Sequence, residues 1–283
     1  MTHYEQNVFP ETHVRQVKKV CFCADDFALN TSISYAILKL LAMHRLNAVS
    51  CMTQSPDWDI WGPQLLVYKN DVDIGLHFNL THHFPYVNQV QHSSIKQLMI
   101  NAWLRKLDKK IIYQELQNQW DRFVAVMGFI PDFIDGHQHI HQFPIIRDVL
   151  IDFAAKNQFN GWVRSLSGTI VTPSEHRIKS ILLPWLGSKS LAALCQKFNI
   201  KTNDQFAGIY DFSNPFNYQK LVCHWLSRVS ESAVVMCHPA FSNEPSSDVI
   251  ALARYQEYLY LSSDTFIQDY KDNQVMLARI GVK

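Results

Sequence analysis

The chain has 283 residues and a formal net charge of +1, and 18% of its residues are charged. No basic run is present, which argues against nucleic acid as a partner, because phosphate binding needs clustered Lys and Arg. An apolar fraction of 47% allows a large buried core, and the length suits one α/β barrel or two small domains. No apolar run is long enough to predict a membrane span, and the polar N-terminus lacks a signal core, so we expect a cytoplasmic protein.

Short apolar runs rich in β-forming residues alternate along the chain with longer segments of helical periodicity. In chain order, the short runs predict strands at residues 19–24, 47–53, 72–80, 132–135, 161–166, 206–210, 233–237 and 275–280. The segments between them predict helices at residues 30–41, 58–68, 95–128, 144–157, 174–198, 218–229, 249–262 and 265–270. The helix at 95–128 is expected to break near 106–110, and the helix at 174–198 is expected to break at Pro184.

Strands that alternate with helices predict βαβ units and a mostly parallel sheet. The sequence has no internal repeat and no break in composition. We therefore expect an N-terminal extension, residues 1–17, followed by a single α/β domain, residues 18–283.

Several predicted strands end in the polar residues that a metal-dependent hydrolase uses. They are Asp25, Asp26, His77, His137 and His238. Because active sites of such parallel sheets lie at the carboxyl ends of the strands, we expect these side chains to lie close together. Carboxylate and imidazole groups bind divalent ions, and a second carboxylate can take the proton of an attacking water.

Asp25 and Asp26 follow directly on an apolar strand. Where the backbone turns out of the strand, both side chains can face the site, one as a ligand and the other beside the attacking water. The alternative is an aspartate that caps the following helix, which is a common use. Asn30 and Thr31 are available as caps, and this favours the functional interpretation.

The histidines have competing interpretations. His77 is predicted as a ligand, although a single histidine in an apolar strand is more often a hydrogen-bonded core residue. His137, His139 and His141 alternate and would share one face of an extended segment. Three imidazoles on one ion would leave no open position, so His137, nearest the strand end, is the better ligand candidate.

Histidine titrates near neutral pH, so His238 can protonate a leaving group. A histidine that is hydrogen-bonded in a turn has equal weight on spacing alone. His82 and His83 are expected at the surface.

Four motifs occur in a fixed order: Ala24-Asp25-Asp26-Phe27, Gly75–Thr81, Asp135–His141 and Cys237-His238-Pro239. Together they resemble the YdjC-like carbohydrate deacetylases, over about residues 18 to 280. The resemblance implies a distorted, TIM-like (β/α) barrel that is often a homodimer. It also implies hydrolysis of the N-acetyl group of an N-acetylated amino sugar, in an oligosaccharide or glycan lipid, with release of acetate. The glycine usual after Asp-Asp-Phe is Ala28 here, so the turn is expected to differ.

By motif position, the resemblance implies Asp26, His77 and His137 as ligands of one divalent ion, with Asp25 as general base and His238 as general acid. One carboxylate and two imidazoles suit Zn²⁺, Mn²⁺ or Co²⁺, and more weakly Mg²⁺; we expect magnesium or zinc. Arg164, His139 and His141 are predicted to contact the sugar. Arg164 has a structural ion pair as its equal alternative.

Three other functions remain open. A metal-dependent esterase or phosphoesterase would use the same residues on another bond. Two histidines and one carboxylate also form the triad of Fe(II) oxygenases, which usually stands on an all-β fold. A catalytically inactive glycan-binding protein is disfavoured, because all five positions hold competent residues.

Overall fold

The structure is a computed structural model that describes residues 17–84, 94–172, 187–230, 232–242 and 248–281. Its strands are β1 (Lys18–Phe27), β2 (Ala48–Cys51), β3 (Asp73–Phe78), β4 (Phe133–Gly136), β5 (Trp162–Val163), β6 (Lys201–Thr202), β7 (Gln205–Ala207), β8 (Ala233–Cys237) and β9 (Val275–Leu277). Its α-helices are α1 (Thr31–Ala42), α2 (Trp58–Trp61), α3 (Ile95–Trp103), α4 (Lys109–Met127), α5 (Ile146–Lys156), α7 (Ser188–Lys197), α8 (Tyr218–Arg228), α9 (Ala251–Leu261) and α10 (Asp264–Asp272). Three 3₁₀ segments are η1 (Gly62–Tyr68), η2 (His137–Gln142) and η3 (Pro215–Asn217).

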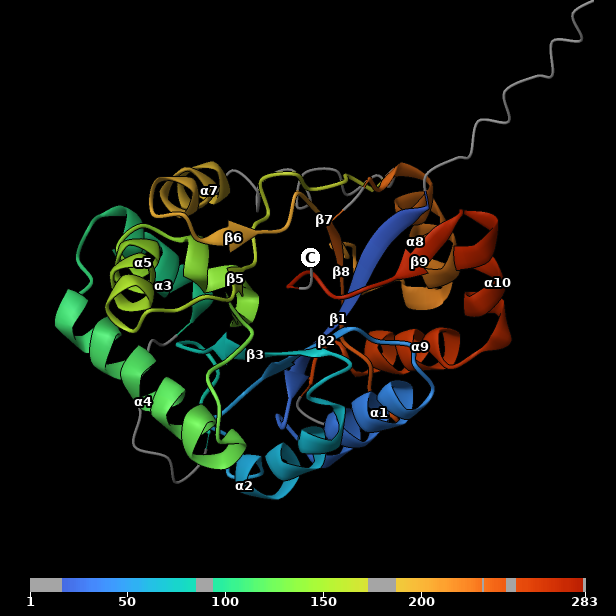
Figure 1. Cartoon of the computed structure of the whole chain (residues 1–283), viewed down its shortest axis with the longest axis horizontal. Helices are drawn as coiled ribbons and strands as arrows, with labels where there is room; N and C mark the ends of the chain where they lie inside the picture. The colour runs from blue at the N-terminus through green and yellow to red at the C-terminus, as the bar shows by residue number, and fades with distance from the viewer. Residues whose placement is uncertain (1–16, 85–93, 173–186, 231, 243–247, 282–283) are drawn as a thin grey trace, which may run out of the picture.

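The strands form one sheet in the order β6-β5-β4-β3-β2-β1-β8-β7, and β9 pairs with the start of β1. Every strand pair among the described residues is parallel. The sheet curls around the middle of the molecule and the helices lie outside it (Figure 1). This arrangement is a distorted (β/α) barrel, and the predicted fold class is confirmed.

Burial explains why the strands read as continuous apolar runs. In β1, every residue from Val20 to Phe27 is buried, because the helices cover one face and the barrel interior covers the other. The following helix, α1, begins where the Asn30 side chain accepts a hydrogen bond from the Ile33 backbone N–H at 3.0 Å. Its buried side, which includes Ile33 and Ile37, packs into the main hydrophobic cluster.

Each predicted strand overlaps an observed one, and β6, which has two residues, was missed. The break expected near 106–110 is confirmed, since α3 ends at Trp103 and α4 begins at Lys109. The segment predicted as helix at 58–68 is helical over those bounds, but only α2 is α-helical; it continues as the 3₁₀ segment η1, where Pro63 lacks an N–H to donate. Most of the helix predicted at 174–198, including Pro184, lies outside the described residues; α7 is its described part.

At the amino ends of the strands, a buried carboxylate holds the C-terminal segment. Asp73, the first residue of β3, accepts hydrogen bonds from Trp162 Nε1 at 3.1 Å and Arg279 Nε at 2.6 Å. It also accepts from the backbone N–H groups of Ile280 at 3.1 Å and Gly281 at 3.3 Å. Three of these four donors, from Arg279, Ile280 and Gly281, attach the chain's last described residues to the barrel.

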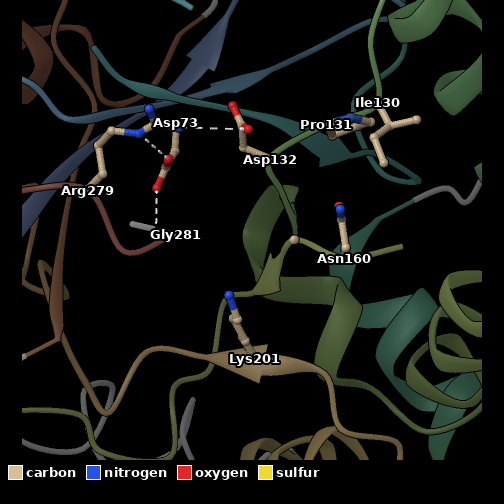
Figure 2. A pocket seen from close by; sticks show the side chains of 9 residues that line it. Asp73, Ile130, Pro131, Asp132, Asn160, Lys201, Arg279 and Gly281 are labelled. Atoms are coloured by element: carbon tan, nitrogen blue, oxygen red, sulfur yellow. Dashed lines mark hydrogen bonds and ion pairs between the residues drawn. The ribbon is translucent and has the colours of Figure 1, made fainter. Parts of the chain in front are cut away.

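A polar pocket opens beside this carboxylate (Figure 2). Its polar lining residues include Asp73, Asp132, Asn160, Lys201 and Arg279. They begin or precede strands, or belong to the C-terminal segment, so the pocket lies at the opposite end of the barrel from the predicted site. Among the helices that the structure describes, none has the length and apolar character needed to cross a membrane.

Candidate metal centre

The end of β1 brings both aspartates to the carboxyl end of the barrel. Asp26 has φ of 65° and Ala28 has φ of 69°, in the left-handed region that non-glycine residues rarely occupy. The chain therefore turns sharply here, and Asp25 and Asp26 are both buried in the site. Because Asn30 caps α1, neither aspartate is needed as its cap.

Three predicted ligands converge at this end. Asp26 Oδ1 lies 3.3 Å from His77 Nε2 and 2.9 Å from His137 Nδ1. One ligand atom from each residue lies within 4.8 Å of the others. Asp26 and His77 are almost fully buried, whereas 14% of the His137 side chain is exposed, so solvent reaches the group from the His137 side.

His77 is oriented by neighbours that were not predicted. Its Nδ1 lies 2.7 Å from Asp135 Oδ1 and 2.9 Å from Ser50 Oγ. Ser50 Oγ also donates a hydrogen bond to Asp135 Oδ1. With the Nδ1–H donated to a carboxylate, the lone pair of the neutral ring is on Nε2, which faces Asp26. A histidine that a carboxylate orients in this way is typical of metal ligands.

The charges in the site favour a cation. Burial alone lowers the pKa of His77, but the carboxylates of Asp135 and Asp25 raise it to about 10. Burial opposes ionisation of Asp26, yet Arg254 and His137 hold the pKa of its carboxyl well below its usual range. The surroundings thus stabilise positive charge between His77 and Asp26, as a proton on the imidazole or as a metal ion. Asp26, His77 and His137 therefore fit a divalent ion.

Arg164 is buried beneath Asp25. Its NH1 and NH2 groups donate to the two oxygens of Asp25 at 2.7 and 2.6 Å, and NH2 lies 2.7 Å from Asp135 Oδ2. The residue is fully buried, so the predicted contact with a sugar does not fit, and the ion-pair alternative is what the structure shows. Cys23, Asp25 and Asp135 form a second cluster of metal-binding types, but the Arg164 guanidinium neutralises it and burial raises the pKa of the Cys23 thiol.

His238 follows β8, and its ring faces the carboxylate of Asp25. Its Nε2 lies 4.0 Å from Asp25 Oδ2, and 13% of its side chain is exposed. Its ring stands edge-to-face to Phe212 with centroids 5.5 Å apart. Burial lowers the pKa of His238 to about 4, so the imidazole of the free protein is neutral at neutral pH. A neutral ring beside Asp25 can accept a proton before it donates one.

The three histidines after β4 do not share a face, because η2 is a 3₁₀ turn in which His139 is left-handed with φ of 59°. His141 is fully buried, and its Nε2 lies 2.9 Å from the Arg164 backbone oxygen, so the predicted sugar contact does not fit it. His139 is 8% exposed and packs edge-to-face on Phe206 at 5.6 Å. Only His137 reaches the metal group.

The chain is similar to known proteins over most of its length. The family described as YdjC-like protein matches residues 19–272. The chain belongs to the YdjC-like family. A chitooligosaccharide deacetylase of Yersinia pestis (strain Pestoides F) is 28% identical over 228 residues, which cover 78% of this chain and 81% of that protein. Its counterpart from Yersinia pseudotuberculosis has the same identity and coverage.

Among solved structures, a putative cellobiose-phosphate cleavage protein of Enterococcus faecalis V583 superposes with a TM-score of 0.66 and 17% identity. The match covers 94% of this chain and 98% of that one, and it shows a shared fold.

Sequence reasoning missed several residues of this YdjC-like site. Asp135 was noted only as the neighbour of the histidine motif, although an acid at a strand end is itself a signal. Arg254 was not among the predicted site residues. His82, expected at the surface, is half-buried, and its ring lies 6.0 Å from that of His137. Asn79 holds this turn, donating to the His82 carbonyl and accepting from the His82 N–H, both at 2.8 Å.

Proposed function

We propose that this YdjC-like chain is a metal-dependent deacetylase that removes the N-acetyl group of an N-acetylated amino sugar. The observation that carries the proposal is the convergence of Asp26, His77 and His137 within 4.8 Å, with Asp25 and His238 beside them. The substrate class is taken from the relatives named chitooligosaccharide deacetylase, at 28% identity.

Asp26, His77 and His137 would hold the ion, which when bound supplies Lewis acidity toward the amide carbonyl and toward water. Asp25 takes the proton of the water that attacks the amide carbon, and Arg164 keeps both carboxylate oxygens in a fixed orientation.

His238 then delivers a proton to the amide nitrogen. Because its imidazole is neutral beforehand, it needs a source, and Asp25 Oδ2 at 4.0 Å is the adjacent one. The proton that leaves the water thus reaches the nitrogen through Asp25 and His238 as the C–N bond breaks. The products are acetate and a free amino sugar.

The native metal, the homodimer and the cytoplasmic location stay predictions from the sequence. Magnesium and zinc are the expected ions, and manganese and cobalt are compatible with the same ligands. Size-exclusion chromatography with light scattering measures the mass in solution directly.

The deciding experiment measures acetate release from a panel of N-acetylated sugars of increasing chain length. The panel is run with each of the four ions and with a chelator. We expect metal-dependent release from at least one substrate and its loss on chelation. Hydrolysis of sugar esters or phosphate esters without release from any acetamide would contradict the proposal, as would tight sugar binding without turnover.

A further inference from the structure

One face of α9 points into the site and carries two buried charged residues, Arg254 and Glu257. They are three positions apart, so they lie on the same side of the helix, one turn from each other. Arg254 is 4% exposed and Glu257 is 1% exposed. Burying a charged group is unfavourable unless it is paired, so their partners show what each one does.

Arg254 donates a hydrogen bond to Asp26, one of the three proposed metal ligands. Its NH2 donates to Asp26 Oδ2 at 2.6 Å and its Nε donates to Asp248 Oδ2 at 2.6 Å. The other oxygen of Asp26, Oδ1, is the one that faces His77 and His137. The guanidinium therefore fixes the rotation of the Asp26 carboxylate and directs a single oxygen toward the two imidazoles.

Glu257 binds the backbone that carries the predicted acid. Its Oε2 accepts a hydrogen bond from the His238 backbone N–H, and its Oε1 accepts one from Tyr210 OH at 2.6 Å. The Ala240 N–H donates to the Arg254 carbonyl at 3.1 Å, which adds a second link between α9 and the exit of β8. The next residue, Pro239, has no N–H with which to help.

A purely structural role would be mutual neutralisation of two buried charges. The partners argue against it. In the described part of the chain, Arg254 forms its ion pairs with Asp26 and Asp248, and Glu257 bonds to His238 and Tyr210. Each charge is directed at a different component of the site.

We propose that α9 is a positioning element, in which Arg254 orients Asp26 for the ion and Glu257 fixes the backbone of His238. The two residues keep a constant distance between Asp26, on the metal side of the site, and His238, on the acid side, because both residues belong to one turn of the same helix. The inference rests on the proposed function, and it assigns neither residue a direct contact with substrate.

The first test replaces Arg254 with lysine, which keeps the charge and loses the two-armed geometry. Its matched control is Arg279→Lys, at the Asp73–Arg279 ion pair on the opposite end of the barrel. Isothermal titration should show divalent-ion binding that is about 10- to 100-fold weaker in Arg254→Lys and unchanged in Arg279→Lys. Melting temperatures report whether the two variants fold equally well.

The second test replaces Glu257 with glutamine. Since Glu257 holds the acid and not the ion, we expect kcat to fall while KM and ion affinity stay within about twofold. Tyr210→Phe, which removes the other donor to Glu257, should shift kcat the same way by less. The matched control on the same helix is Tyr260→Phe, whose hydroxyl donates to Asp269 and does not contact the site.

The outcomes separate the two proposals. Normal ion affinity in Arg254→Lys, alongside lost affinity in Asp26→Asn, would overturn the positioning role and leave the deacetylase proposal standing. So would an equal loss of kcat in Glu257→Gln and Tyr260→Phe. If the wild-type protein bound no divalent ion, both proposals would fail together.

Discussion

The two ends of this barrel each bury an aspartate against an arginine, and the two pairs do different things. At the amino end, four donors saturate Asp73, all from the protein's own chain. At the carboxyl end, Arg254 binds one oxygen of Asp26, and the other oxygen faces two imidazoles. The Asp73–Arg279 pair stabilises the fold, whereas the Asp26–Arg254 pair leaves one oxygen of Asp26 available to bind a ligand.

Charge sharpens this contrast. Three buried aspartates, Asp25, Asp26 and Asp135, share the carboxyl end with two buried guanidinium groups, Arg164 and Arg254. An excess of negative charge that is kept out of water is unfavourable unless a cation joins it. The presence of a buried ion pair alone therefore says little about function. The informative feature is whether the pair leaves a carboxylate oxygen, such as Asp26 Oδ1, available to a ligand.

Asp25→Asn should give the largest effect. The amide cannot take a proton from water, so turnover should fall by about 100- to 10,000-fold. Ion affinity should persist, because Asp26, His77 and His137 are intact. Acetate release and calorimetry measure the two quantities. Asp73→Asn, the matched change at the amino end, should retain turnover per folded molecule; comparable losses in both variants would contradict the assignment.

Asp135→Asn tests the residue that orients His77. The neutral amide oxygen of asparagine is a weaker acceptor for the His77 Nδ1–H than a carboxylate, and the charge pairing with Arg164 is lost, so we expect ion affinity to fall about 10- to 100-fold. Competition with a chromophoric chelator gives the dissociation constant. Ser50→Ala removes a donor to the same oxygen and should cost less. Unchanged affinity in Asp135→Asn would show that His77 needs no support.

Asp73→Asn should act on stability alone. It replaces a carboxylate that binds Arg279 and Trp162 with an amide that presents a donor to one of them. The loss of charge-assisted hydrogen bonds should lower the free energy of unfolding by about 2 to 3 kcal/mol. Urea denaturation measures it. A lower stability accompanied by weaker ion binding would mean that the two ends are coupled.

The titration of Glu257, at the carboxyl end of the barrel, makes the stability of the folded protein depend on pH. Burial raises its pKa from 4.5 to about 7. Because the folded value is the higher one, its contribution to stability is complete below pH 4.5 and is lost as the pH rises through about 7. Glu257→Gln stays neutral, so between about pH 4.5 and 8 the stability difference should shift in its favour by up to about 3 kcal/mol, at about 1.4 per pH unit. If urea denaturation gave the same difference in unfolding free energy between Glu257→Gln and the wild type at every pH, this prediction would be wrong.

Much of the site follows from a local rule. Polar residues at the ends of apolar strands located Asp25, Asp26, His77, His137 and His238, because parallel strands bring their carboxyl ends to one rim. The alternation of strand and helix likewise predicted the parallel sheet, and the family resemblance predicted that it forms a distorted barrel. Each of these patterns spans only a few consecutive residues, so it can be recognised in the sequence without knowledge of the fold.

The supporting residues could not be found in this way. Arg254 and Glu257 lie within a helical pattern, where charged residues usually mark a solvent-exposed face. Their role depends on which strand α9 meets in the folded chain. The regular spacing from His137 to His141 suggested a shared face, but the left-handed backbone at His139 is not visible in spacing.

Ala28→Gly should produce the smallest effect, and it tests the strain at the carboxyl end. Ala28 is buried with φ of 69°, a conformation that costs an L-residue about 1 to 2 kcal/mol. Glycine removes that cost but gives the unfolded chain more freedom and loses a buried methyl group, so we expect a net gain below about 1 kcal/mol. The matched control is Ala24→Gly in the extended part of β1, where no strain is relieved and stability should fall. Because the two substitutions delete the same methyl group, equal losses in thermal denaturation would show that the turn after Asp26 carries no strain.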